Sequence, residues 1–185
     1  MEHENLIEIH LRLIEGGQFT NFVFDEMKEK SIHKIKGPIG QFFLRNSKKP
    51  IIFVAGGTGF APIKSIIEDI MFNKIKRPIF LYRGVRKFDD LYMHDLCLEW
   101  AQSIDEFTYI PVSENESKDC DQLRIGLVHK VVLEDIVDLE NVQVYCCGAP
   151  GLVETAFNEF ISKGLPEEEF FADAFTFEPR RNLEL

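Results

Sequence analysis

From residue 50 onward, short runs of continuous apolar residues alternate with segments of helical periodicity. We expect strands at residues 51–55, 78–82, 107–112, 142–146 and 169–174. Helical patterns fill the intervals, at residues 61–72, 90–101, 127–133 and 151–163. A strand that is apolar on both faces is typical of a parallel sheet covered by helices on its two sides. The pattern therefore predicts an α/β domain at residues 48–179, with a five-stranded, parallel, doubly wound sheet.

Residues 1–47 show a different pattern, which predicts an incomplete antiparallel β piece in front of the α/β domain. Residues 6–13 and 32–36 each alternate apolar and polar side chains, and residues 42–44 resume an extended pattern. Thr20 is expected to cap a short helix between the first two of these segments. About 45 residues with three strands cannot easily close a barrel or bury a full core alone. The piece should therefore pack on the α/β domain or pair with another chain through its strand edges, with a homodimer as one outcome.

Charge and cysteine usage exclude several classes of partner. The net charge is −10, which argues against a nucleic-acid partner, because binding to its backbone depends on clustered Lys and Arg. The cysteines include no Cys-x-x-Cys pair, so no metal site is expected, and they indicate a reducing, cytoplasmic setting. Adjacent Cys146 and Cys147 should point to opposite faces of a strand. No membrane span and no signal peptide are expected, and residues 180–185 are expected to form a polar tail.

Residues 51–62 have the pattern of a strand, a glycine turn and a helix start. In the turn Gly56-Gly57-Thr58-Gly59, the glycines let backbone N–H groups approach an anion closely. Ala61 and Pro62 fall in the first helical turn, where Pro needs no N–H donor and the helix N-terminus favours negative charge. The spacing is not that of the Gly-x-Gly-x-x-Gly fingerprint. From these residues alone, a pyrophosphate-binding loop and a tight turn without a ligand both remain open.

Four motifs resemble the ferredoxin–NADP reductase superfamily, in its NAD(P)H–flavin reductase branch, which includes the CDP-6-deoxy-glucoseen reductase-like proteins. Gly37-Pro38-Ile39-Gly40-Gln41-Phe42 is similar to the turn that closes the family's flavin domain. The turn at residues 56–62 is similar to its nicotinamide–pyrophosphate loop, and Cys147-Gly148-Ala149-Pro150 is similar to its Cys-Gly-x-Pro motif. The segment from Phe171 to Phe175 is similar to its C-terminal aromatic strand. The order and spacing of the motifs match over nearly the whole chain.

The resemblance implies an NAD(P)H-dependent flavin oxidoreductase, in which nicotinamide C4 passes a hydride to flavin N5. Electrons then continue to an iron–sulfur centre, an oxygenase or free flavin. Thr58 and Cys147 match positions that flank the nicotinamide ring, and Phe175 matches a residue that approaches the flavin, so these three are the candidate catalytic residues. Ordinary core packing is the alternative for Phe175, and a buried structural role suits Cys146 better than Cys147.

Two groups of candidate cofactor-binding residues follow from the same resemblance. Those expected at NAD(P)H are Gly56, Gly57, Thr58, Gly59, Ala61, Pro62, Ser113, Glu114, Cys147, Gly148, Ala149 and Pro150. Those expected at the pyrophosphate of FAD are Gly16, Gly17, Phe19 and Thr20. NADPH users of the family carry an Arg where Glu114 follows the third strand, and a carboxylate repels a 2′-phosphate but accepts from a ribose 2′-OH. NADH is therefore favoured, with Arg83 and Arg86, after the preceding strand, as alternative positive groups.

The family's Arg-x-Tyr-Ser/Thr motif, which holds the flavin, does not occur in this sequence. Most of the flavin pocket should lie in the part of the barrel that carries this motif, so retention of FAD is in question. Two functions stay open. The chain is a flavin reductase in partial form, with a dinucleotide and an electron-accepting protein or flavin as partners. Alternatively, it is a non-catalytic NAD(P)-binding regulatory or partner subunit without bound flavin.

Overall fold

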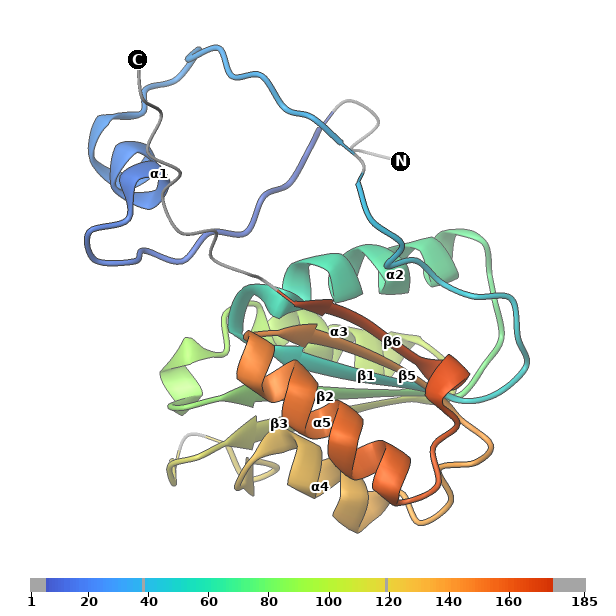
Figure 1. The fold of residues 1–185 in the computed structure, drawn as a ribbon. Helices are drawn as coiled ribbons and strands as arrows, with labels where there is room; N and C mark the ends of the chain where they lie inside the picture. The colour runs from blue at the N-terminus through green and yellow to red at the C-terminus, as the bar shows by residue number, and fades with distance from the viewer. Residues whose placement is uncertain (1–5, 38, 119, 175–185) are drawn as a thin grey trace. The chain divides into compact units, whose positions relative to one another are not determined.

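The computed structural model describes residues 6–37, 39–118 and 120–174, and the chain divides into two compact units, Met1–Gln41 and Phe42–Leu185. The second unit holds one six-stranded sheet in which every strand pair is parallel (Figure 1). Its strands are β1 (Ile51–Gly56), β2 (Ile79–Val85), β3 (Phe107–Ser113), β4 (Arg124–Ile125), β5 (Gln143–Gly148) and β6 (Phe170–Ala174). Its α-helices are α2 (Phe60–Phe72), α3 (His94–Ser103), α4 (Val128–Asp135) and α5 (Pro150–Ser162). Short 3-10 turns are η2 (Gly57–Gly59), η3 (Phe88–Asp90) and η4 (Glu167–Glu169).

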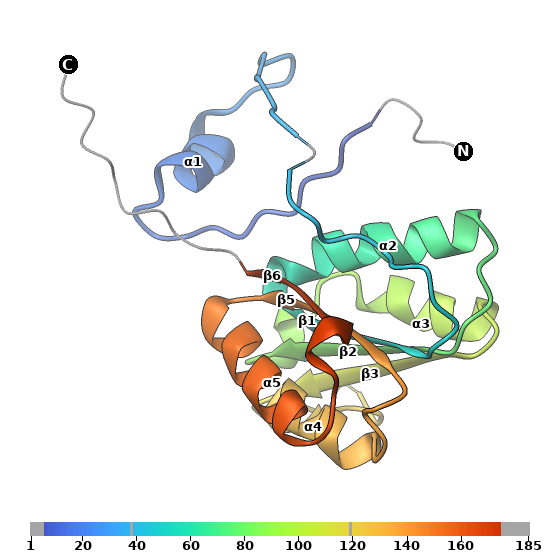
Figure 2. The same cartoon turned by 45° about the vertical axis from the view of Figure 1, so that its right-hand side comes forward.

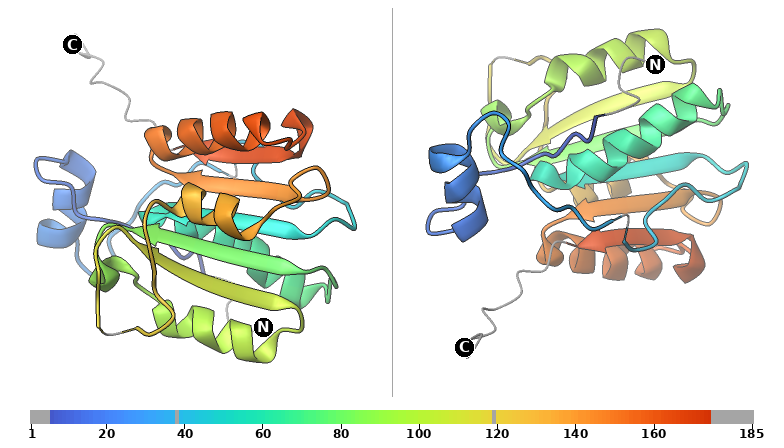
Figure 3. Two further views of the ribbon diagram at one scale, coloured as in Figure 1. Left: turned by 90° about the horizontal axis from the view of Figure 1, so that it is seen from below. Right: turned by 90° about the horizontal axis from the view of Figure 1, so that it is seen from above.

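Helices cover both faces of this sheet, α2 and α3 on one side and α4 and α5 on the other (Figures 2 and 3). Successive residues of β1 therefore enter different cores. Phe53 packs in the core that contains Trp100 of α3, whereas Val54 packs in the core that contains Phe160 of α5. Each such side chain contributes about 1.5–3 kcal/mol when it is fully buried. Burial on both faces explains why the apolar runs are continuous, and it confirms the predicted doubly wound parallel sheet.

The sheet has six strands where the sequence pattern predicts five. The additional strand, β4, has only two residues, and it extends the sheet by pairing Arg124 with Val112 and Ile125 with Ser113 of β3. Arg124 is polar and Ile125 is half exposed, so this edge strand has no apolar run that a sequence pattern could reveal. The carbonyl oxygen of Ser113 in β3 also accepts from the N–H of Gly126, directly after β4, at 2.9 Å.

The predicted strands before residue 47 are absent from the described residues. In the first unit the structure describes only two short helices, α1 (Gln18–Asn21) and the π-helix η1 (Phe22–Glu26), and residues 42–44 form no strand in the second. The apolar side chains of residues 6–13 are largely exposed, with Ile7 at 72%. A strand needs a hydrogen-bonded neighbouring strand. Alternation of apolar and polar residues indicates which side chains share a face, but it does not supply that neighbour. The strands predicted at residues 6–13, 32–36 and 42–44 are therefore not formed in the described part of the chain.

Thr20 does not cap the helix that was predicted to start there. It lies inside α1, which begins after Gly17 and has no side-chain cap. The Thr20 hydroxyl instead donates to the carbonyl oxygen of Ile14 at 3.2 Å, across the turn at Gly16, whose φ is +74°. A threonine hydroxyl can form a hydrogen bond with a nearby backbone group instead of capping a helix. Here it bonds to the backbone of the preceding turn.

A buried histidine between α4 and α5 predicts a pH-dependent stability. His129 is 5% exposed, neither ring nitrogen has a hydrogen-bond partner among the described residues, and its Nε2 lies 3.6 Å from Glu159 Oε2. Burial lowers the pKa of His129, Glu159 opposes this shift, and Lys130 adds to it. The unfolded chain thus binds a proton more readily, so unfolding becomes easier as the pH falls below about 6.5.

We expect His129→Leu to flatten this part of the stability profile. Urea unfolding should be followed at several pH values between about 5 and about 7.5, where the wild-type chain should gain stability as the pH rises. The variant should gain less over the same window, because it has no buried imidazole to protonate. The pKa of Glu159, lowered mainly by its hydrogen bond from Lys130, gives a further loss at more acidic pH. Parallel profiles of the two proteins would show that His129 does not carry the dependence.

Candidate functional site

The glycine turn and the Cys-Gly-Ala-Pro motif meet at the topological switch point of the sheet. The strand order β4-β3-β2-β1-β5-β6 means that the chain proceeds outward from β1 and then returns to β5 on the other side of β1. Ligands of open α/β sheets bind at the carboxyl ends of the strands where the order reverses in this way. Gly56 ends β1 and Gly148 ends β5 at this place. The structure therefore brings together two segments that are far apart in sequence.

Gly59 and Gly57 serve different purposes in the turn. A Cβ atom on Gly59 would lie 2.7 Å from the backbone N of Gly148 and closer still to the carbonyl of Cys147, so no side chain fits there. Gly57 has a φ of +52°, which favours glycine, and a Cβ there would meet open space. The first turn of α2 follows, with no side-chain cap, and Pro62 needs no donor in it. The turn thus packs closely on β5 at Gly59 and is open at Gly57, which suits a backbone that approaches an anion.

A single row of residues crosses the sheet beneath this turn. The register places Ala55 of β1 between Arg83 of β2 and Cys147 of β5, and Cys147 next to Asp173 of β6. Neighbouring residues of parallel strands point to the same face, which here is the face covered by α2. Within this row, the cation of Arg83 and the carboxylate of Asp173 flank two small residues. Sequence reasoning placed Asp173 in a motif without a role, and only the register shows that it adjoins Cys147.

Cys147 is buried and free, and its environment does not favour a thiolate. Burial raises the pKa of Cys147, and the nearby side chains of Asp173 and Cys146 raise it further. The thiol is therefore protonated at neutral pH and does not act as a nucleophile. Cys146 points to the opposite core, as predicted for adjacent strand residues, and burial raises its pKa to about 12. Because both side chains are fully buried, burial does not distinguish a structural role for Cys146 from a site role for Cys147.

The end of β3 carries the residues expected near the adenine ribose. Ser113 is buried, and its hydroxyl donates to the carbonyl of Arg86 at 3.1 Å and accepts from the N–H of Asn115 at 3.2 Å. The Ser113 side chain thus shapes the loop. Glu114 is exposed, and its backbone N–H donates to the carbonyl of Val85 at 3.0 Å. Of these residues, Glu114 has the side chain that is open to a ligand.

The two arginines near β2 differ from the sequence expectation. Arg83 lies within β2 instead of after it, and it is 1% exposed, so its guanidinium does not reach a phosphate on the surface. The sequence pattern did not reveal this burial, because an arginine at a strand end usually points into solvent. Arg86 follows β2 and is exposed. It is the member of the pair that remains available for a negatively charged ligand.

The remaining candidate residues lie in the first unit or outside the described residues. Gly16, Gly17, Phe19 and Thr20 belong to the first unit, where α1 has four residues and Phe19 is 57% exposed. Phe175 and residues 180–185 lie outside the described residues. Among the described residues, no group of three or more His, Cys, Asp or Glu side chains is placed to hold a metal ion. The same residues include no helix with the length and apolar character of a membrane span.

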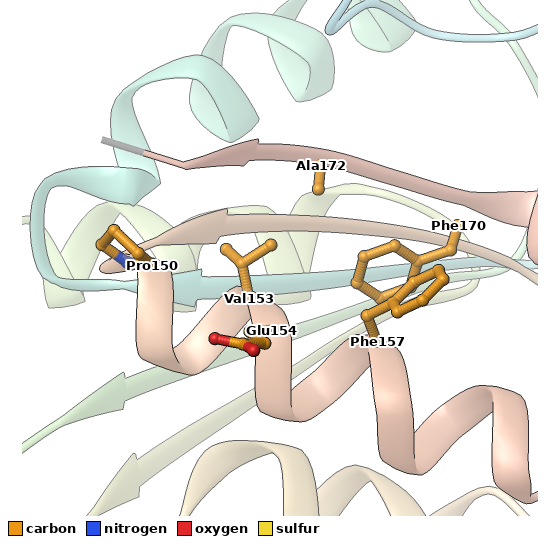
Figure 4. A pocket seen from close by; sticks show the side chains of 6 residues that line it. All are labelled: Pro150, Val153, Glu154, Phe157, Phe170 and Ala172. Carbon is orange, nitrogen blue, oxygen red and sulfur yellow. The ribbon is translucent and has the colours of Figure 1, made fainter. Parts of the chain in front are cut away.

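An open groove of about 460 Å³ lies along α5 and β6 (Figure 4). Its lining residues are Pro150, Val153, Glu154, Phe157, Phe170 and Ala172. Val153 belongs to the core under α4 and α5, so the groove opens on the face opposite to Ala55 and Cys147. The lining contains no glycine, and Pro150, at the start of α5, is its one member from the two motifs of the switch point. It therefore does not match what a pyrophosphate requires, and the switch point is the better candidate.

Comparisons with known proteins agree with this architecture. The profile of the oxidoreductase NAD-binding domain matches residues 53–157, and that of the oxidoreductase FAD-binding domain matches residues 1–44. Protein RfbI of Salmonella typhimurium is 39% identical over 95% of this chain and 52% of its own length. The CDP-6-deoxy-L-threo-D-glycero-4-hexulose-3-dehydrase reductase of Yersinia pestis is 40% identical over 91% of this chain and 51% of its own. The chain thus spans about half the length of the curated relatives it matches.

Solved structures show the same fold. The Amycolatopsis cytochrome P450 reductase GcoB superposes with a TM-score of 0.82 at 26% identity, over 89% of this chain and 50% of that one. The ferredoxin reductase in carbazole 1,9a-dioxygenase superposes with a TM-score of 0.72 at 21% identity, over 90% and 50% of the two chains. The NAD-binding profile covers more than half of the chain, from β1 into α5. The chain therefore belongs to the oxidoreductase NAD-binding domain family, within the ferredoxin–NADP reductase superfamily.

Proposed function

We propose that this chain is the nicotinamide-binding part of an NAD(P)H-dependent flavin oxidoreductase. The observation that carries the proposal is the convergence of Gly56–Gly59 and Cys147–Pro150 at the switch point, where open α/β sheets bind dinucleotides. The bound cofactors supply hydride transfer from nicotinamide C4 to flavin N5, and an iron–sulfur centre, an oxygenase or free flavin takes the electrons. The named reductases among the relatives support this activity and a protein electron acceptor. A cytoplasmic location is part of the same proposal.

The residues of the switch point have distinct roles in this proposal. The N–H groups of the turn and of the first turn of α2 bind the pyrophosphate, which Gly59 allows by letting the turn lie directly on β5. Thr58 and the backbone around Cys147 hold the nicotinamide ring from two sides. Gly148, Ala149 and Pro150 shape the turn beneath the dinucleotide. Phe175, proposed to approach the flavin, lies outside the described residues.

Mixing the chain with FAD and NADH without oxygen tests the activity directly. The flavin absorbance should bleach as hydride reaches N5, and the rate should fall when NADH is omitted. A chain that binds NADH by calorimetry but leaves the flavin oxidised would lack the activity while keeping the dinucleotide site. A chain that binds neither nucleotide would contradict the proposal altogether.

Exposure in the first unit favours a second candidate, a non-catalytic NAD(P)-binding partner subunit without bound flavin. The FAD-binding profile matches residues 1–44, yet the described residues there form no strand, and Ile32 is 98% exposed. FAD needs an ordered pocket, which these residues do not supply by themselves. Calorimetric titration with FAD separates the two candidates, because tight binding of FAD to this chain would contradict the subunit role.

We also propose that the exposed apolar side chains of the first unit are covered by another chain, with a second copy as the simplest partner. Leu6, Ile7, Ile9 and Leu13 are each more than half exposed. Contiguous exposed apolar residues of this kind mark interaction surfaces. Light scattering after gel filtration should give the mass of a dimer at micromolar concentration, and Ile7→Lys should shift it toward the monomer. A wild-type monomer at every concentration would contradict self-association.

Glu114→Arg should change the preference between the two nicotinamide dinucleotides. Glu114 is exposed at the end of β3, where a carboxylate accepts from a ribose 2′-OH and repels a 2′-phosphate. The ratio of the NADPH to the NADH dissociation constant should fall by about tenfold, which corresponds to about 1.4 kcal/mol. Glu154→Arg makes the same charge change on α5 and should leave the ratio unchanged. Equal ratios for wild type and Glu114→Arg would show that this loop does not contact the ribose.

A further inference from the structure

A buried arginine lies directly beneath the start of α2. The guanidinium carbon of Arg83 is 3.8 Å from the centre of the Phe60 ring and 5.0 Å from that of Tyr92. Its Nη1 donates to the carbonyl oxygen of Tyr92 at 2.6 Å. The rings of Phe60 and Tyr92 also meet edge to face, 5.9 Å apart. Phe60 is the first residue of α2 and follows Gly59 directly, so Arg83 supports the helix end that forms the pyrophosphate site.

The partners of Arg83 among the described residues are all uncharged. Besides Tyr92, they are the Cys97 sulfur, 3.6 Å from Nη1, and the phenol of Tyr109. A cation that is 1% exposed loses its hydration, and hydrogen bonds to neutral groups offset only part of that cost. Stacking on aromatic rings offsets some of the remainder. An anion bound near the carboxyl ends of β1 and β2 would provide the missing counter-charge.

The position of Arg83 in the sheet gives its charge a direct effect on such an anion. Arg83 is the neighbour of Ala55 in the row beneath the turn, one residue before Gly56 ends β1. A buried charge is screened less by salt than an exposed one. Its field adds to that of the α2 N-terminus, because both favour negative charge at the same edge of the sheet. Because the guanidinium is covered by Phe60 and Tyr92, it acts without touching the ligand.

We infer that Arg83 is a positioning residue, which fixes the start of α2 and supplies a buried positive charge for the pyrophosphate of the dinucleotide. The inference rests on the proposed function, because it assigns Arg83 to the same site. It also separates two contributions, since the charge and the stacking can be removed one at a time. Methionine retains an unbranched apolar stem without charge, whereas lysine retains the charge without the planar group that stacks on Phe60.

The test measures NADH affinity of the full chain by calorimetry, together with competition by inorganic pyrophosphate. Arg83→Met should weaken NADH binding by about tenfold and weaken competition by pyrophosphate by a similar factor. Arg83→Lys should restore both to within about threefold of wild type. Lys76→Met removes an exposed charge that precedes β2, at the opposite end of the strand, and should change neither. Thermal unfolding of each protein shows whether a loss of binding follows a loss of folding.

The possible results are distinguishable. Unchanged NADH affinity in a folded Arg83→Met protein overturns the inference and leaves the proposed function standing. Equal losses in the methionine and lysine variants also overturn it, because they would show a packing role without a contribution from the charge. If wild type itself binds no NADH, the proposed function fails together with the inference. If Arg83→Met does not fold, Arg83→Gln removes the same charge with a side chain that can still donate to Tyr92.

Discussion

Gly59→Ala is expected to weaken NADH binding by more than about tenfold and to destabilise the second unit. The added Cβ would lie 2.7 Å from the backbone N of Gly148 and closer to the carbonyl of Cys147. Both are backbone atoms of the strand end, so they cannot rotate away as a side chain could. The turn must therefore lift off β5, which displaces the N–H groups that bind the pyrophosphate. We expect an unfolding cost of about 1–3 kcal/mol and an affinity loss of more than about tenfold.

Calorimetry with NADH and urea unfolding measure the two effects, and Gly151→Ala is the matched control for stability. A Cβ on Gly151 meets nothing within 4 Å, and Gly151 is exposed within α5. Alanine favours a helix over glycine, so the control should be neutral or stabilising by up to about 1 kcal/mol. Normal binding and stability in Gly59→Ala would show that the contact between the turn and β5 does not position the site.

Arg77→Met is expected to destabilise the second unit strongly. Arg77 is 4% exposed, and its guanidinium donates to the carbonyl oxygens of Lys49 at 2.7 Å and Arg45 at 3.3 Å and to Gln143 Oε1 at 2.8 Å. Methionine would fill most of the volume but remove all three hydrogen bonds, and the hydroxyl of Tyr145, at 3.5 Å, would be the donor left to Gln143 Oε1 among the described residues. An unsatisfied buried polar group costs about 1–3 kcal/mol, and several are affected at once. We expect a loss of about 3 kcal/mol in the free energy of unfolding.

Lys76→Met is the control for this substitution, because Lys76 is the exposed neighbour with no hydrogen bond or ion pair among the described residues. Surface substitutions of this kind usually change stability by less than about 0.5 kcal/mol. Urea midpoints of the two variants should differ clearly, with unchanged slopes. Similar midpoints would mean that water or neighbouring groups replace Arg77 without cost.

The hydrogen bonds of Arg77 also attach the segment before β1 to the sheet. Gln143 extends this network. Its amide nitrogen donates to Glu169 at 2.7 Å, and Glu169 forms an ion pair with Lys49 at 2.8 Å. Residues 45–49, the start of β5 and the turn before β6 are thereby joined at the amino ends of the strands. These contacts lie at the edge opposite to the glycine turn. The hydrogen bonds of Arg77 and the candidate site therefore lie at opposite edges of one sheet. Arg77→Met should lower stability without altering the glycine turn, whereas Gly59→Ala should affect both NADH binding and stability.

The sequence alone revealed the architecture of the second unit, because both faces of each inner strand are buried. Ile51, Ile52, Phe53 and Val54 form one unbroken apolar run, and similar runs occur in β2 and β5, whereas the exposed Thr108 interrupts that of β3. A segment with this pattern can satisfy its burial only between two layers of helices. The strand β4 escaped prediction because its two residues sit at an edge, where burial imposes no pattern.

The alternating residues 6–13 show the limit of local patterns. Alternation indicates which side chains could share a face, but pairing needs a second strand, and the described residues of the first unit contain none. The burial of Arg83 is a second feature that local sequence patterns do not reveal. Its neighbours Phe60, Tyr92 and Cys97 come from different parts of the chain, so no window of sequence contains the environment that keeps an arginine inside.

By itself, the sequence determined the layered parallel sheet and the two glycine-containing motifs of the site, because hydrophobic burial and backbone freedom are written residue by residue. Only the tertiary structure decided that Gly59 lies against Cys147, that Asp173 adjoins the same cysteine, and that Arg83 lies beneath α2. These relations depend on strand order and register, which bring distant segments together. Register is fixed by the summed packing of the whole sheet, and no single segment carries that information.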